Sequence, residues 1–351
     1  MARKAATSNK APSTLAPVRV DLALQGGGSH GAFTWGVLDR LLDETWLELE
    51  GISGTSAGAM NAAVMASGWA PGGREGAQAA LADFWGRVAD AALLSPLRRG
   101  PLDMMLGRWS LDSSPFYQAL DLAARLWSPY DLNPRGANPL ARIIEATVDF
   151  EAVATSPLKL FVTATNVRTG RGRVFRNAEL SPDVLLASAC LPSVFHAVEI
   201  DGEAYWDGGY AGNPTITPLV RDCGADDTIL VQINPVETAG LPRGAREIND
   251  RINELSFNAP LLKELRMIAV LQQVADPGHS EGALWARMRM HRIDTTAMDT
   301  LSASSKMLAE WPFFCMLRDE GRHAADIFLL EHGGDLGQRS SMDLAALLEG
   351  I

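Results

Sequence analysis

Two segments near the start of the chain show the same order of elements, and this pattern restricts the fold more than any other feature. A short apolar run over residues 18–25 leads into the glycine-rich turn 26–31 and then into a segment with helical periodicity. A second apolar run, 47–53, leads into the Gly-Thr-Ser-Ala-Gly turn 54–58 and an all-apolar helix beginning at Ala59. Successive strand–turn–helix units predict an α/β fold with a parallel sheet.

The rest of the chain extends this pattern and then departs from it. Residues 94–139 are rich in proline and large apolar side chains, and two alternatives stay open for them: an excursion packed on the core, or a lid or cap that faces lipid. The chain beyond about residue 240 is expected to be mostly helical. The other predicted elements are an amphipathic helix over 73–93, strands at 158–167, 173–176 and 228–234, a hairpin at 195–206 and a long helix at 246–275.

Composition excludes several classes of protein. Hydrophobic residues make up 47% of the chain and charged residues 21%, as in ordinary soluble globular proteins. The net charge of −11 argues against a nucleic-acid partner, because phosphate binding needs a basic face. Three cysteines without metal-ligand or framework spacing predict neither a disulfide nor a zinc site and favour a reducing, cytoplasmic location.

Access to membranes is expected to be peripheral. Residues 1–17 lack the apolar core of a signal peptide and are predicted to form a disordered tail. No apolar run reaches the ~18 residues that a spanning helix needs. If the substrate is a lipid, we expect the protein to reach it from the water side, with transient contact at the lipid surface.

The turn Gly54-Thr55-Ser56-Ala57-Gly58 matches the G-x-S-x-G pattern of a nucleophile elbow. Gly54 and Gly58 permit the close approach of strand and helix that exposes a serine hydroxyl at a sharp turn. The helix that follows adds unpaired N–H groups and the positive end of its dipole. The competing interpretation is an ordinary strand-to-helix turn with a capping serine, but the apolar strand before it and the apolar helix after it favour Ser56 as a nucleophile.

The turn Gly26-Gly27-Gly28-Ser29-His30-Gly31 permits two interpretations. It satisfies G-x-G-x-x-G, with Glu48 or Glu50 near the spacing expected for an acidic ribose ligand, so a nucleotide-binding loop is one alternative. The other is an oxyanion hole formed by the backbone N–H groups of Gly26, Gly27 and Gly28, with Gly31 completing the turn. The second is favoured because the next strand runs directly into the serine elbow.

A serine nucleophile needs a base within hydrogen-bonding reach. The chain order Ser56, Asp207 and a later histidine permits a triad, but His279, His291, His323 and His332 stand in charged, irregular segments that favour surface positions. Asp207 instead ends a predicted strand, and Gly208-Gly209 after it lets the backbone turn. A direct Ser56–Asp207 dyad is the simpler hypothesis.

The glycine loop, the serine elbow and Asp207-Gly208-Gly209, in this order, resemble the patatin-like phospholipases. The stretch 186–195 and the segment through Asn213-Pro214 strengthen the resemblance, which covers roughly residues 18–235. It implies a three-layer α/β/α sandwich with a mostly parallel sheet, a catalytic domain at 18–235, and a helical extension at 236–351 packed on it.

The activity that the resemblance implies is hydrolysis of ester-linked acyl chains in phospholipids or neutral lipids, without a metal or cofactor. Ser56 is the nucleophile, Asp207 the proton acceptor, and Gly26–Gly28 the oxyanion donors. Many relatives carry Arg or Lys where this chain has His30, so we expect a charge that titrates near neutrality at that position. A catalytically silent lipid-binding scaffold remains as an alternative function.

Overall fold

The computed structural model describes residues 16–93, 95–238, 240–274 and 281–349. The disordered tail predicted for residues 1–17 therefore lies outside the described residues, apart from positions 16 and 17. No helix in the described ranges is both long and apolar enough to cross a bilayer.

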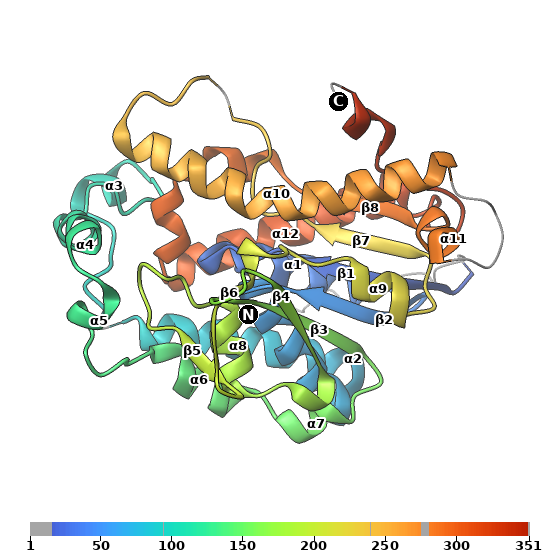
Figure 1. The fold of residues 1–351 in the computed structure, drawn as a ribbon, viewed down its shortest axis with the longest axis horizontal. Coiled ribbons are helices and arrows are strands. Elements are labelled where there is room, and N and C mark those ends of the chain that lie inside the picture. The colour runs from blue at the N-terminus through green and yellow to red at the C-terminus, as the bar shows by residue number, and fades with distance from the viewer. Residues whose placement is uncertain (1–15, 94, 239, 275–280, 350–351) are drawn as a thin grey trace, which may run out of the picture.

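One mixed sheet forms the centre of the molecule (Figure 1). Its strands lie in the order β5-β6-β3-β2-β1-β7-β8, and β4 pairs with β3 off this path. The pairs β1–β2, β1–β7, β2–β3 and β7–β8 are parallel, whereas β3–β4, β3–β6 and β5–β6 are antiparallel. The strands are β1 (Val18–Leu24), β2 (Leu47–Gly54), β3 (Lys159–Asn166), β4 (Gly172–Arg176), β5 (Val198–Ile200), β6 (Glu203–Asp207), β7 (Asp227–Val231) and β8 (Arg289–Ile293).

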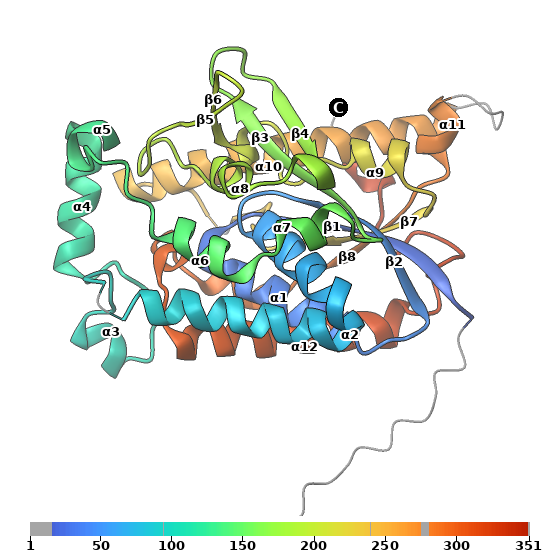
Figure 2. The ribbon, with the colours of Figure 1, turned by 90° about the horizontal axis from the view of Figure 1, so that it is seen from below.

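Helices cover both faces of the sheet, which confirms the predicted three-layer α/β/α arrangement. Figure 2 shows α1, α2 and α12 on one side of the sheet and α9, α10 and α11 on the other. The helices are α1 (Gly31–Leu41), α2 (Ala57–Ala91), α3 (Pro101–Met105), α4 (Pro115–Leu126), α5 (Pro129–Leu132), α6 (Pro139–Thr147), α7 (Phe150–Ala154), α8 (Pro182–Ser188), α9 (Thr217–Asp222), α10 (Ala245–Val274), α11 (Glu281–Ala286) and α12 (Trp311–His332).

Each face of the sheet has its own apolar core. Phe33 of α1 and Phe314 of α12 are fully buried in the larger core, together with the first turns of α2. Leu261 and Ile268 of α10 pack with Trp285 of α11 in the smaller core. Burial of apolar surface on both sides explains why the central strands read as nearly continuous hydrophobic runs.

The two helices predicted after the serine elbow form one kinked element. Gly73 within α2 has non-helical angles, φ 58° and ψ −142°, and Pro71 stands just before it. Proline lacks the N–H that continues a helix, and glycine adopts the positive φ without steric cost. The sequence therefore located the break between the two helical segments correctly.

The region after residue 235 contains a strand that the sequence analysis did not predict. The long α10 is present as expected, but β8 joins the sheet beside β7 in parallel. Its sequence, Arg-Met-His-Arg-Ile, mixes charged and apolar residues and so lacks the signature of a buried strand. Helix α12 packs so closely on α1 that a side chain at Gly36 or Gly321 would overlap the backbone of the other helix. The C-terminal portion thus contributes β8 to the central sheet and helices to both layers, α12 on one face and α10 and α11 on the other.

Candidate active site

Ser56 lies at the sharp turn between β2 and α2. Its backbone has φ 53° and ψ −121°, a conformation that non-glycine residues rarely adopt. A Cβ on Gly54 would lie 2.7 Å from the carbonyl carbon of Gly58, so the strand and the helix approach each other too closely for larger residues. The Ser56 residue is partly exposed, and the backbone geometry is that of the predicted elbow.

Asp207 lies at the end of β6, opposite Ala164 of β3, and only 2% of its surface is exposed. One carboxylate oxygen accepts a hydrogen bond of 2.7 Å from the N–H of Gly209, and the carboxyl also bonds with the side chain of Ser56. Burial raises the pKa of Asp207 to about 7, against the opposing effect of these two hydrogen bonds. The two residues predicted to act together are therefore in contact.

The glycine loop lies directly against the serine elbow. A Cβ on Gly26 would be 2.7 Å from the Cβ of Ser56. The N–H of Gly26, however, already donates to the side-chain oxygen of Asn213 at 2.7 Å. Among the described residues, no hydrogen bond is recorded from the N–H of Gly27 or Gly28. Because the N–H of Gly26 is already bonded to Asn213, the predicted oxyanion donors that remain are the N–H groups of Gly27 and Gly28.

The remaining motif glycines permit close approaches between elements of the site. Gly31, which opens α1, leaves room for the side chain of Ala57, since a Cβ there would lie 2.6 Å from that of Ala57. A side chain at Gly208 would overlap the carbonyl of Thr163 in β3, and one at Gly209 would overlap the ring of Phe257 in α10. Gly208 and Gly209 thus let the turn that follows Asp207 pack against β3 and against α10.

Four polar residues that no motif in the sequence reveals hold the site together. The Ser188 hydroxyl accepts the N–H of Ser56 at 2.9 Å. The side-chain amide of Asn234 donates to the carbonyl of Gly26 at 2.7 Å. The Gln25 side-chain oxygen accepts two backbone N–H groups at the end of β7, both at 2.9 Å. With Asn213 these make four residues; all four stand in segments that had been singled out, but none had been assigned a role.

The expectation for His30 is wrong. Its ring is 3% exposed and its Nε2 lies 2.7 Å from the hydroxyl of Ser305. Burial, with a smaller contribution from the nearby Lys306, lowers the pKa of His30 to about 3. The imidazole is therefore neutral at physiological pH and provides no titrating charge at the glycine loop.

Among the later histidines that the structure describes, none has a hydrogen bond to Ser56 or Asp207, and not all are at the surface as expected. His291 of β8 is fully buried and bonds with Asp227 and Ser341, each at 3.0 Å, so its predicted surface position is wrong. His323 is exposed on α12, and His332 bonds with Asp335. His279 falls outside the described residues.

The acidic residues required by the nucleotide-binding alternative have other partners or positions. Glu50 lies within β2, where its carboxylate accepts 2.8 Å and 3.0 Å hydrogen bonds from Lys159 and the N–H of Gly224. Burial acts to raise the pKa of Glu50, but the hydrogen bonds from Lys159 and Gly224 and the charges of Lys159 and Arg19 outweigh it, so the pKa is lowered. Glu48 is exposed in the same strand. The glycine loop faces Ser56 instead of a free acidic group at the end of a strand.

The described part of the segment 94–139, residues 95–139, contacts the C-terminal region at one point and His196 at another. On one side, the N–H of Leu111 donates to the hydroxyl of Ser304, the neighbour of the Ser305 that contacts His30. On the other side, Tyr130 stacks on His196 with ring centroids 4.1 Å apart. Between these anchors, α4 has no buried residue. We call residues 95–139 the cap segment.

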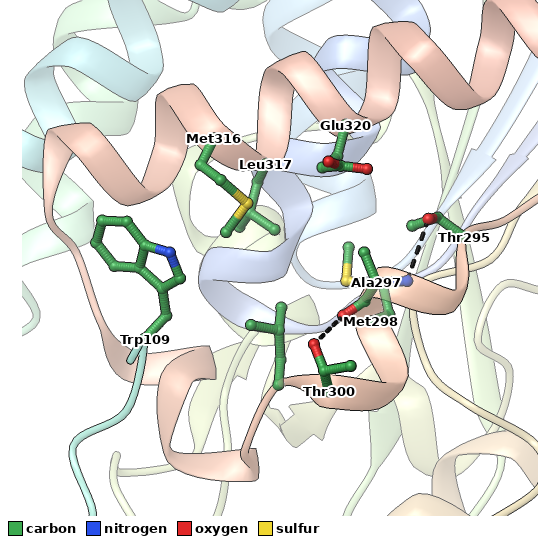
Figure 3. A pocket seen from close by; sticks show the side chains of 9 residues that line it. Trp109, Thr295, Ala297, Met298, Thr300, Met316, Leu317 and Glu320 are labelled. Atoms are coloured by element: carbon green, nitrogen blue, oxygen red, sulfur yellow. Dashed lines mark hydrogen bonds between the residues drawn. The ribbon is translucent and has the colours of Figure 1, made fainter. Parts of the chain in front are cut away.

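A cavity of about 170 Å³ lies between the cap segment and the C-terminal region, not at the dyad. Figure 3 shows Trp109 of the cap segment facing Met316, Leu317 and Glu320 of α12. The opposite wall is the short helix Thr296–Thr300, in which Thr300 donates to the carbonyl of Ala297 at 2.8 Å. Neither Ser56 nor Asp207 lines this cavity, so it is not part of the candidate active site.

Comparison with known proteins identifies the family. A family model described as patatin-like phospholipase matches residues 22–220, which is more than half of the chain. The chain belongs to the patatin-like phospholipase family. Membership of this family points to lipid acyl hydrolysis, and the matched residues include the glycine loop, Ser56 and Asp207.

A search of curated protein sequences gives no significant match. Among solved structures, the patatin-like chain is similar to the crystal structure of VipD from Legionella pneumophila, with 15% sequence identity and a TM-score of 0.36. That alignment covers 89% of this chain and 67% of VipD.

Proposed function

We propose that this chain is a serine acyl hydrolase that cleaves ester-linked fatty acyl chains of phospholipids or neutral lipids. The observation that carries the proposal is the contact between the Ser56 side chain and the buried carboxyl of Asp207, at a serine with φ 53°. The N–H groups of Gly27 and Gly28, on a loop that touches Ser56, are the proposed oxyanion donors. The family supports the substrate class.

The reaction would proceed in two steps. Asp207 takes the hydroxyl proton of Ser56 as the serine oxygen attacks the ester carbonyl, and the glycine loop binds the oxygen that becomes negative. Collapse of this intermediate releases the alcohol, which takes the proton from Asp207, and leaves an acyl ester on Ser56. Asp207 then removes a proton from water as the water attacks this ester, and it returns the proton to the Ser56 oxygen as the fatty acid leaves. No step calls for a metal or cofactor.

Exposed apolar side chains of the cap segment support the proposed transient contact with a lipid surface. Leu122 and Leu126 on α4 are 59% and 66% exposed, and Met105 on α3 is 85% exposed. Apolar side chains grouped in this way mark surfaces that bind a partner or a lipid. Leu122 and Leu126 lie between the two anchors of the cap segment and Met105 precedes the first anchor, and this exposed face is the one proposed to meet lipid.

The test combines covalent labelling with hydrolysis. A fluorophosphonate should label wild-type protein at Ser56, as mapped by mass spectrometry, and p-nitrophenyl esters of increasing chain length should be hydrolysed with a preference for long chains. Ser56→Ala should abolish both, and Ser156→Ala, in the segment before β3, should change neither. A protein that binds vesicles but shows neither labelling nor turnover would be a silent scaffold, and the proposal would be wrong.

A further inference from the structure

Lys306, from the C-terminal region outside the matched family residues, reaches the glycine loop of the site. Its ammonium group donates to the side-chain oxygen of Asn234 at 2.8 Å. Its backbone carbonyl lies against Gly28, where a Cβ would overlap it. Lys306 therefore contacts the loop through its backbone and through one intervening side chain, and the dyad chemistry makes no use of it.

The surrounding donors and acceptors fix the orientation of the Asn234 amide. The Gln25 side-chain oxygen accepts the backbone N–H groups of Ile233 and Asn234, so it must also be the acceptor for the Asn234 amide nitrogen at 3.3 Å. That nitrogen donates to the carbonyl of Gly26 at 2.7 Å. The amide oxygen consequently faces Lys306, which can only donate. A lysine at 306 thus favours the single amide orientation that serves Gly26.

The contact at Gly26 determines where the N–H of Gly27 points. The carbonyl of Gly26 and the N–H of Gly27 belong to one planar trans peptide and point in opposite directions. The N–H of Gly26 is held separately by Asn213 at 2.7 Å. A donor on the Gly26 carbonyl also polarises the peptide and strengthens the Gly27 N–H as a donor. The positive charge of Lys306, one side chain away, acts in the same direction.

We propose that Lys306 is a positioning residue for the oxyanion hole, acting through Asn234 to orient and polarise the Gly26–Gly27 peptide. This inference rests on the proposed function, because it assigns a role within the same site. Lys306 is partly buried; burial lowers its pKa, while the charges of Glu254 and Asp250 favour its charged form. His30 is neutral. The positive charge near the glycine loop is therefore that of Lys306, which the C-terminal region supplies.

The test measures steady-state hydrolysis of p-nitrophenyl butyrate and the rate of fluorophosphonate labelling. Removing one oxyanion donor lowers kcat by roughly 100- to 1000-fold, so misorienting one is expected to cost about 10- to 100-fold. Lys306→Met should show this loss in kcat and in the labelling rate, with KM nearly unchanged. Lys263→Met, at an exposed position of α10, is the matched control and should behave as wild type.

Asn234→Asp provides a second variant in case Lys306→Met folds poorly. It keeps an oxygen facing Lys306 but replaces the donor to Gly26 with an acceptor, so it should lose kcat to a similar extent. Adding Lys306→Met to Asn234→Asp should then cause little further loss. A wild type that is labelled and active while both folded variants stay within twofold of it would overturn the role of Lys306 alone. A wild type without labelling or hydrolysis would overturn the proposed function and this inference together.

Discussion

The hydroxyl of Ser188 lies 2.9 Å from the backbone nitrogen of Ser56 and accepts its N–H. The same hydroxyl donates to the carbonyl of Thr163 in β3 at 2.7 Å. Ser188 is fully buried at the end of α8. A side chain from one element thus ties the strained backbone of the candidate nucleophile to the neighbouring strand, and a residue at φ 53° persists only where its surroundings hold it.

We expect Ser188→Ala to lower both stability and activity. The buried N–H of Ser56 and the carbonyl of Thr163 lose their shared partner, which costs about 1–3 kcal/mol of unfolding free energy. Relaxation of the elbow should also reduce kcat, measured with p-nitrophenyl butyrate at a temperature where the variant is folded. Ser193→Ala, at an exposed position five residues later, is the control. An unchanged kcat in folded Ser188→Ala would show that the elbow holds its conformation without this contact.

The sequence predicted the parts of the site that are contiguous along the chain. The strand, turn and helix around Ser56 and around Gly26–Gly28 carry their own signals, since apolar runs and glycines stand next to each other there. Asn213 and Asn234 could not be assigned, because a single amide in a loop gives no sign of the backbone group that it will meet after folding. The burial of His30 was missed for a related reason: Ser305 and Lys306, which surround it, lie about 275 residues away.

The pH dependence of hydrolysis should follow Asp207. Its pKa of about 7 means that the carboxylate, the form that accepts a proton, predominates only above neutral pH. We expect kcat/KM to fall as the pH drops through about 7, whereas an ordinary aspartate would keep its activity down to about pH 4. The labelling rate of Ser56 by a fluorophosphonate should show the same limb. A profile that stays flat down to pH 5 would contradict the burial effect on Asp207.

His291→Leu separates a dyad from a triad. His291 bonds with the buried Asp227, whose pKa is lowered to about 2 by His291 and Arg289 even though burial raises it. Because the pKa of Asp227 is lower in the folded protein than the ordinary value of 3.8, the ionised carboxylate stabilises the fold above pH 3.8. This stabilisation is lost as the pH falls toward 2. The variant should therefore lose about 1–3 kcal/mol of stability at neutral pH.

In the same His291→Leu variant, kcat should be unchanged while the protein is folded, because Ser56 contacts Asp207 directly. His323→Leu, at an exposed site on α12, is the matched control for both readouts. Loss of hydrolysis by several orders of magnitude in folded His291→Leu would favour a serine–aspartate–histidine arrangement instead of the dyad.

The cap segment should matter for lipid surfaces and not for soluble esters. Changing both Leu122 and Leu126 on α4 to Ser removes exposed apolar area without disturbing a buried residue. We expect hydrolysis of phosphatidylcholine vesicles to fall severalfold, while p-nitrophenyl butyrate turnover and the melting temperature stay constant. Leu330→Ser on α12, where the leucine is 87% exposed, is the control. Equal losses with both substrates would place the effect at the dyad instead of at a lipid-binding surface.

Asp207→Asn should stabilise the protein at neutral and alkaline pH. The unfolded chain ionises Asp207 near pH 3.8, whereas the folded protein holds its proton up to about pH 7. The folded state therefore binds more protons between these values, and its stability falls as the pH rises from about 4 to 7.

An asparagine keeps the acceptor for the N–H of Gly209 and avoids the buried charge. Because one pKa unit corresponds to about 1.4 kcal/mol, the gain above pH 7 should reach up to roughly 4 kcal/mol. Urea unfolding of wild type and Asp207→Asn at pH 4 and pH 8 tests this: the difference should be large at pH 8 and nearly absent at pH 4. A variant that is less stable at pH 8 would mean that the ionised carboxylate is favourable where it lies.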